Sequence, residues 1–156
     1  MKMFLAYFFK LFFKVPFLKG SFFGVHQKIF KPLNLFNGLS SIQKHQNIKI
    51  KLNINDWIQQ NIFFLGGYED AELKVLANHL KTDSVFIDIG ANFGLYSLIA
   101  SQHISKEGTI ISFEPFPENY KSLCTNLSLN DLRRITVENT AVGSETGTLN
   151  LYYNSK

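Results

Sequence analysis

The sequence predicts an α/β fold built on a parallel sheet, and the order of segments between residues 85 and 139 is the main reason. Two short apolar segments, Val85–Ile89 and Thr109–Phe113, each have an acid at their C-terminal end, Asp88 and Glu114, and a third strand is expected at 135–139. Segments with helical periodicity separate them, so the order is β-α-β-α-β, which requires right-handed crossovers between parallel strands. The first segment is apolar almost throughout, as expected for a strand buried on both faces.

The first predicted helix lies near the N-terminus and is amphipathic. At about 100° per residue, Lys10 and Lys14 share one side, whereas Phe4, Phe8 and Phe12 share another. Three interpretations stay open. The aromatic side packs on the rest of the protein, or it lies on a membrane surface that attracts the lysines. In the third, the segment spans a membrane, although it is short and interrupted by charge.

The elements that follow this helix are less regular. Residues 48–54 alternate between apolar and polar side chains, which predicts a strand with one solvated face. Residues 57–64 fit a short helix or a strand equally well. Residues 69–80 predict an amphipathic helix with acids in its first turn.

Two connecting helices and one further strand complete the predicted elements. Residues 93–103 form the first connection. The second runs to residue 129 and starts near Pro117, because proline suits the first helical position and Glu118 favours the same end. Residues 148–153 predict an antiparallel extension of the sheet.

Charge and aromatic content divide the chain into a basic aromatic region, 1–55, and a second domain, 56–156. The first contains nine lysines and no acid, and ten of the sixteen phenylalanines precede residue 37. The second has seven basic and twelve acidic side chains. No arginine precedes residue 133 and no nucleic-acid module is recognised, so no nucleic-acid partner is expected. The single cysteine permits no internal disulfide, and no Cys/His spacing suggests a metal.

The turn after the first strand of the sheet, residues 88–94, reads Asp-Ile-Gly-Ala-Asn-Phe-Gly. It is not the dinucleotide fingerprint, because it has only two glycines and Asn92 replaces the middle one. A ligand without phosphate needs less room there, and S-adenosylmethionine is such a ligand. N–H groups at the helix start, from Asn92 to Leu95, suit its carboxylate. Asp88 suits its ammonium group, and Glu114 suits both ribose hydroxyls.

Each of these residues also has a purely structural interpretation. Asp88 could cap the next helix, and Glu114 could be a solvated loop acid. Gly90 and Gly94 could relieve packing between strand and helix, and Asn92 could be there because it tolerates a left-handed turn.

Five ordered segments within residues 55–153 resemble the FkbM family of S-adenosylmethionine-dependent methyltransferases. They read Gly-Tyr-Glu, Asp-Ile-Gly-Ala-Asn-Phe-Gly-Leu-Tyr-Ser-Leu, Phe-Glu-Pro-Phe-Pro-Glu-Asn-Tyr, Asn-Leu-Ser-Leu-Asn and Asn-Thr-Ala-Val-Gly-Ser. The resemblance implies a Rossmann-like class I methyltransferase fold, with helices flanking a parallel sheet of which only the N-terminal half is present. The family's Asp-x-Glu-Gly segment does not occur, so a truncated member is expected, with a short stable homologue as the alternative.

The same resemblance implies a set of cofactor-binding residues. Asp88, Gly90, Ala91, Asn92 and Gly94 would line the methionine end, Glu114 the ribose, Pro115 and Phe116 the adenine, and Asn139 and Ala141 the adenine edge. Tyr68 and Glu69 are expected either as a lid over the cofactor or only as a helix start. No residue is identified as the catalytic base, and no metal is expected.

The expected function is therefore oxygen-directed methyl transfer from S-adenosylmethionine to a sugar, a glycan or a small metabolite. The chain would be a fragment without the C-terminal substrate half. It would be cytoplasmic. Peripheral contact of residues 1–20 with the inner face of a membrane stays an open interpretation. Two alternatives remain. One is a non-catalytic cofactor-binding remnant or membrane-associated interaction protein. The other is an NAD-dependent oxidoreductase, which the missing third glycine disfavours.

Overall fold

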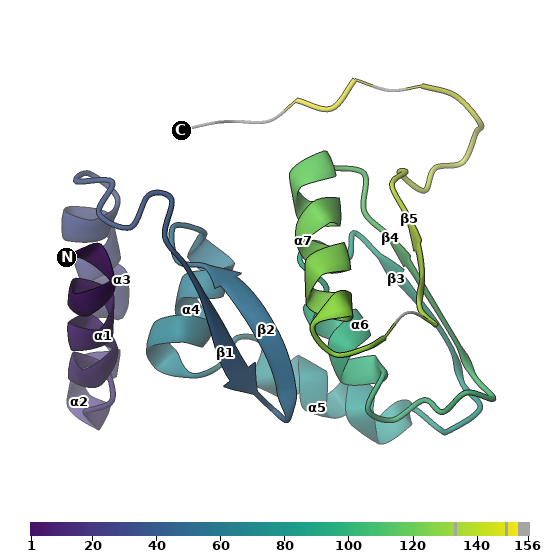
Figure 1. Ribbon diagram of the computed structural model, residues 1–156, viewed down its shortest axis with the longest axis horizontal. Helices are drawn as coiled ribbons and strands as arrows, with labels where there is room; N and C mark the ends of the chain where they lie inside the picture. The colour runs from purple at the N-terminus through teal and green to yellow at the C-terminus, as the bar shows by residue number, and fades with distance from the viewer. Residues whose placement is uncertain (133, 149, 153–156) are drawn as a thin grey trace. The chain divides into compact units, whose positions relative to one another are not determined.

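The computed structural model describes residues 1–132, 134–148 and 150–152, and it contains two compact units. Unit 1 is Met1–Glu72 and unit 2 is Leu73–Lys156, and we describe each by itself (Figure 1). This boundary differs from the compositional one expected after residue 55. The reason is that α4 (Trp57–Leu65) contributes Phe63 and Phe64 to the core of unit 1.

Unit 1 is organised around packed phenylalanine rings. Phe30 is central to this core, with ring centroids 4.8 Å from Phe9, 4.9 Å from Phe36 and 5.4 Å from Phe64. The rings come from consecutive short helices as well as from α4, which explains why phenylalanine is concentrated at this end of the sequence. These short helices are α1 (Lys2–Phe12), α2 (Pro16–Lys19), α3 (Phe22–Val25) and the π-helix η1 (His26–Phe30).

Of the three interpretations left open for the N-terminal helix, packing of the side that carries Phe4 and Phe8 on the rest of the protein does not match unit 1, which buries another side of α1. Ala6 and Phe13, the residue that follows α1, are fully buried and Phe9 packs edge-to-face against Phe30, whereas Phe4 and Phe8 are exposed. Aromatic residues occur all around this helix, so their periodicity could not identify the core-facing side. Among the described residues, no helix combines the length and apolar character required to cross a membrane.

A β-hairpin and α4 follow. β2 (Ile48–Asn53) alternates as predicted and pairs antiparallel with β1 (Ser40–His45), whose polar sequence gave no strand signal. Gln46 and Asn47 form the two-residue turn with positive φ values of 43° and 68°. The ambiguous segment 57–64 is helical, because the Asp56 carboxylate caps it by accepting from the Gln59 N–H at 2.9 Å.

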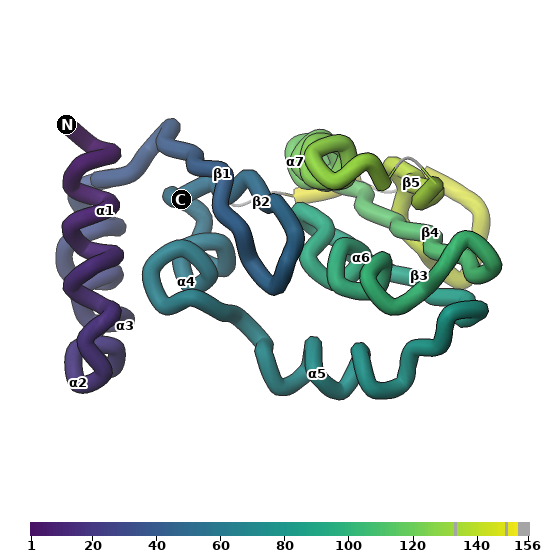
Figure 2. The backbone as a smooth tube through the Cα atoms, turned by 60° about the horizontal axis from the view of Figure 1, so that its bottom comes forward, coloured from purple at the N-terminus to yellow at the C-terminus, as the bar shows by residue number. Residues whose placement is uncertain are grey.

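Unit 2 contains the predicted parallel sheet. β3 (Val85–Ile89) pairs with β4 (Thr109–Phe113), which pairs with β5 (Thr136–Glu138), and both pairings are parallel. The connecting helices are α6 (Leu95–Ala100) and α7 (Pro117–Ser128), which begins at the predicted proline. Figures 1 and 2 show the order of these elements, which α5 (Asp70–His79) precedes.

The two faces of this sheet differ in burial. Ile110 and Ser112 are buried and α6 contacts β3 and β4, whereas Val85, Ile87 and Ile89 are 68%, 53% and 62% exposed. The expectation that β3 is buried on both faces was therefore wrong for the described residues. A continuous apolar segment indicates that both faces of a strand are suited to burial. It does not determine whether another element covers each face.

The remaining predictions need small corrections. The first connecting helix is shorter than the predicted 93–103, because the turn continues to Gly94, and the third strand starts one residue later, at Thr136. In the expected strand at 148–153, residues 148 and 150–152 are not strand, and residues 149 and 153 lie outside the described residues.

Candidate functional site

The turn after β3 crosses the carboxyl end of β4. The N–H groups of Gly90 and Ala91 both donate to the carbonyl oxygen of Phe113, at 2.8 and 3.0 Å. The N–H of Gly94 donates to the Ala91 carbonyl oxygen at 2.8 Å. Positive φ values at Gly90, Asn92 and Gly94, of 80°, 52° and 93°, make this tight path possible.

The two glycines of the turn serve different purposes. A Cβ added at Gly94 would lie 2.5 Å from Cδ1 of Leu123, so this glycine allows α7 to pack closely on the turn. A Cβ added at Gly90 would meet no atom within 4 Å. The packing interpretation therefore holds for Gly94, whereas Gly90 leaves open space above the backbone at the sheet edge.

Glu114 is not a solvated acid, because it is only 5% exposed and bridges two turns. Its Oε2 accepts a hydrogen bond from the Asn92 N–H at 2.7 Å, and its Oε1 accepts one from the Phe116 N–H at 2.9 Å. The Asn139 side-chain amide, which follows β5, donates to the carbonyl oxygens of Glu114 and Pro115 at 2.7 and 3.2 Å. The ends of all three strands are thus joined through this carboxylate and its backbone.

Asp88 is held by two serines that the sequence analysis did not identify. The Ser97 hydroxyl donates to Oδ2 of Asp88 at 2.5 Å and lies 2.7 Å from the Ser112 hydroxyl. A backbone hydrogen bond from Ser97, in the first turn of α6, also favours the ionised carboxylate, while the residue at the N-cap itself is Gly94. Burial raises the pKa of the Asp88 carboxyl, and the nearby Glu114 carboxylate adds to this, although the Ser97 bonds oppose it.

The sequence did contain a pattern that could have identified Ser112 as part of the site. It is the polar residue in the otherwise apolar run Ile110–Phe113 of β4 and lies beside Asp88 in the parallel register. Both serines are fully buried, so their hydroxyls need partners and find them in each other and in the carboxylate. Asn126 of α7 was missed as well, and its side-chain amide donates to the Phe93 carbonyl oxygen at 2.9 Å.

Most of the predicted site residues lie on or beside one edge of the sheet. This group comprises Asp88, Gly90, Ala91, Asn92, Gly94, Glu114, Pro115, Phe116 and Asn139. Ala141 is exposed two residues beyond Asn139. Tyr68 and Glu69 belong to unit 1, so the lid stays a prediction. The N–H groups of Asn92 and Gly94, which were expected to meet a ligand carboxylate, already have acceptors within the chain.

A parallel sheet that brings a glycine-containing turn and a carboxylate to one edge is the Rossmann-like arrangement of class I methyltransferases. Solved structures share this fold. They include P. horikoshii TYW2 in complex with MeSAdo (TM-score 0.52, 19% identity, 81% of this chain and 50% of that one). M. jannaschii TYW2 in complex with AdoMet has a TM-score of 0.50 and 26% identity, over 63% of this chain and 42% of that one.

Sequence relatives point the same way. Methyltransferase sdnD of Sordaria araneosa is 37% identical over 76 residues, which are 48% of this chain and 29% of that protein. The family model described as Vibrio cholerae RfbT protein matches residues 39–153, and the chain belongs to this family. The chain spans at most half of the length of the relatives named here.

Proposed function

We propose that this chain is part of an S-adenosylmethionine-dependent methyltransferase and that unit 2 holds the cofactor at the edge formed by β3 and β4. The observation that carries the proposal is the buried Glu114 carboxylate tied to the turn that leaves open space above Gly90. The sdnD and TYW2 relatives support it, because one is named a methyltransferase and the other was solved with AdoMet. The segments resembling the FkbM family support the finer assignment to that family.

The residues at the edge suit the proposed cofactor. Each oxygen of Glu114 accepts one backbone hydrogen bond and keeps a second lone pair, so two ribose hydroxyls can donate to it without breaking the turn. Pro115 and Phe116 are half-buried beside it and would flank the adenine, with Asn139 and Ala141 at the adenine edge. The cationic end of the methionine moiety would offset the cost of burying the Asp88 carboxylate.

The acceptor of the methyl group is proposed from the family resemblance. An oxygen acceptor on a sugar, a glycan or a small metabolite follows from the FkbM resemblance alone, and none of the relatives named above carries such an acceptor in its name. In any such transfer, the contribution of this edge would be to hold the methyl donor in line with the nucleophile. Because no nucleic-acid partner is expected from the sequence, acceptor screening should include RNA as a test of that expectation.

Calorimetric titration of the full chain with S-adenosylhomocysteine, its 2′-deoxyribose analogue and NAD would test the proposal. The ribose compound should bind at least tenfold more tightly than its deoxy analogue. Glu114→Gln should remove most of this preference, because a charged acceptor contributes about 1.5–3 kcal/mol, or roughly ten- to a hundredfold. Glu118→Gln, at an exposed position on α7, is the matched control. Binding of NAD alone, or an unchanged preference in Glu114→Gln, would disprove the assignment.

A further inference from the structure

The solvent side of α1 carries a continuous apolar stripe. Met1, Phe4, Phe8 and Leu11 follow the helical spacing and are 106%, 80%, 53% and 63% exposed. They lie opposite the side that buries Ala6 and packs Phe9 edge-to-face against Phe30, so the stripe takes no part in the core of unit 1. A contiguous exposed stripe of large apolar side chains is typical of an interaction surface, unlike single exposed residues.

Exposed apolar residues also follow α1 in the sequence. Val15 and Phe17, in the turn after α1 and in α2, are also exposed, the latter by 82%. Lys14 and Lys19 are exposed in the same segment and, with Phe13 and Phe63, help to line a cavity of about 210 Å³. Positive charge and apolar surface therefore occur together around the C-terminal end of α1.

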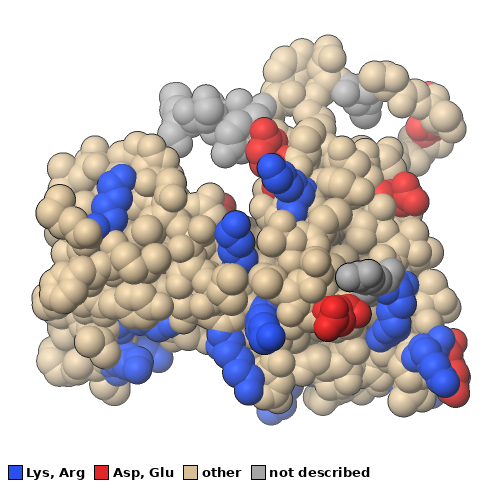
Figure 3. Space-filling view, viewed as in Figure 1, with Lys and Arg blue, Asp and Glu red and all other residues tan. Residues whose placement is uncertain are grey.

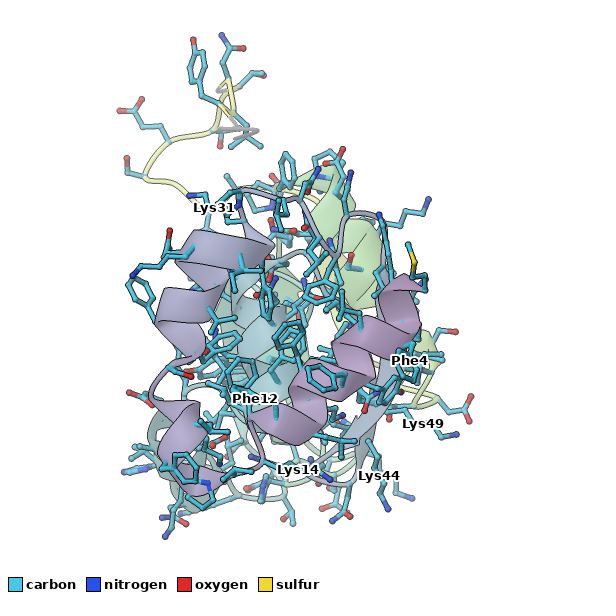
Figure 4. The ribbon with its side chains drawn as sticks, turned by 90° about the vertical axis from the view of Figure 1, so that its left-hand side faces the viewer. Phe4, Phe12, Lys14, Lys31, Lys44 and Lys49 are labelled. Carbon is cyan, nitrogen blue, oxygen red and sulfur yellow. The ribbon has the colours of Figure 1, made fainter. Side chains whose placement is uncertain are left out.

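More lysines belong to the same unit. Figure 4 looks onto α1, with Phe4 and Phe12 on the helix and Lys14, Lys31 and Lys44 labelled around it. Lysine side chains with wide uncharged areas between them are also seen on unit 1 in Figure 3. Residues 1–55 contain nine lysines and no acid, and the four acids of unit 1 all lie in residues 56–72, so unit 1 keeps an excess of positive charge.

Lys10 shows that not every lysine here serves the surface. Its ammonium group donates to the Gln43 side-chain oxygen at 2.6 Å and lies 4.5 Å from the centroid of the Phe63 ring. Burial lowers the pKa of Lys10, and the positive charge of Lys14 lowers it further. Lys10 is therefore part of the packing of unit 1, whereas Lys14 and Lys19 are free to face a partner.

We propose that unit 1 docks on the surface of a bilayer that contains anionic lipid, with α1 parallel to the surface and its apolar stripe in the headgroup region. The exposed lysines contact the headgroups. A lysine-flanked apolar helix face is the arrangement that binds such surfaces, and each lysine near them contributes roughly fivefold to partitioning. The stripe is a convex helix surface rather than a groove, which suits a flat partner. Pairing with a second copy is disfavoured because two copies of unit 1, each with nine lysines against four acids, would repel one another.

This inference is independent of the proposed function, and vesicle co-sedimentation of the full chain tests it. Vesicles with about 30% phosphatidylglycerol should pellet the protein at low salt, while pure phosphatidylcholine should bind it at least tenfold less, and added salt should reduce binding. Phe4→Asp/Phe8→Asp should lower binding at least tenfold, and Lys14→Glu/Lys19→Glu should lower it comparably. Val142→Asp, which changes an exposed valine of unit 2, should bind as the unsubstituted chain does.

Several outcomes would overturn the inference. Equal pelleting of the Phe4→Asp/Phe8→Asp variant and the unsubstituted chain would exclude a role of the stripe in membrane binding. Equal binding to neutral and to anionic vesicles would exclude a role of the lysines. If the chain ignores vesicles but forms a dimer that the same double substitution dissociates, the stripe joins two copies instead. Circular dichroism should confirm that each variant is folded. The lysine variant and the salt series test the charge contribution even if the double aspartate variant is unfolded.

Discussion

Replacing Glu114 with glutamine tests how the candidate site is built, apart from any ligand. The carboxylate accepts from the N–H groups of Asn92 and Phe116 at 2.7 and 2.9 Å. A glutamine side chain has one acceptor oxygen, so it can satisfy one N–H while its own amide group opposes the other. Losing a hydrogen bond to a charged acceptor costs about 1.5–3 kcal/mol, and both of these bonds are partly buried.

Amide hydrogen exchange measures this loss at the two residues concerned. In Glu114→Gln, protection of the Asn92 or Phe116 amide should fall roughly ten- to a hundredfold, which corresponds to that free energy. Protection within the α4 helix of unit 1 should stay unchanged. Glu118→Gln removes an exposed carboxylate of α7 and should leave both amides as protected as before. Unchanged exchange at both amides in Glu114→Gln would refute the view that this carboxylate holds the turn.

Three further predictions concern stability. Gly94→Ala should destabilise unit 2 by about 1–3 kcal/mol more than Gly90→Ala in urea unfolding, since both strain a positive φ but only the former overpacks α7; equal losses would contradict this. Burial raises the pKa of the Asp88 carboxyl, so its stabilising contribution is present at low pH and is lost as pH rises through the folded-state pKa. The stability of Asp88→Asn relative to the unsubstituted chain should therefore increase from about pH 4 to pH 7, and a constant difference would contradict the shift. Phe13→Ala should lower the free energy of unfolding of unit 1 by about 3–5 kcal/mol, and Phe8→Ala by less than about 0.5 kcal/mol, because only Phe13 is buried. The fluorescence of the single tryptophan would report this unfolding. Similar losses in the two variants would show that the buried side of α1 is assigned incorrectly.

The sequence specified those features that depend on neighbours along the chain. The apolar runs of β3 and β4, the alternation of β2 and the proline that starts α7 all predict the observed elements, because their periodicity and dihedral preferences are local. The same local signals predicted a turn near Gly90 and a carboxylate at Glu114 on one edge of the sheet. The unequal charge of the two halves is likewise readable without a fold.

Only the tertiary structure decided what those residues contact. The sequence left Asp88 as a ligand group or a helix cap, and only the structure shows that it bonds Ser97, because that partner comes from the next helix. The side of α1 that is buried depends on rings as distant as Phe30 and Phe64, and the exposed face of β3 depends on what covers it. Burial and hydrogen bonding join residues far apart in sequence, and no local periodicity encodes which of them will meet.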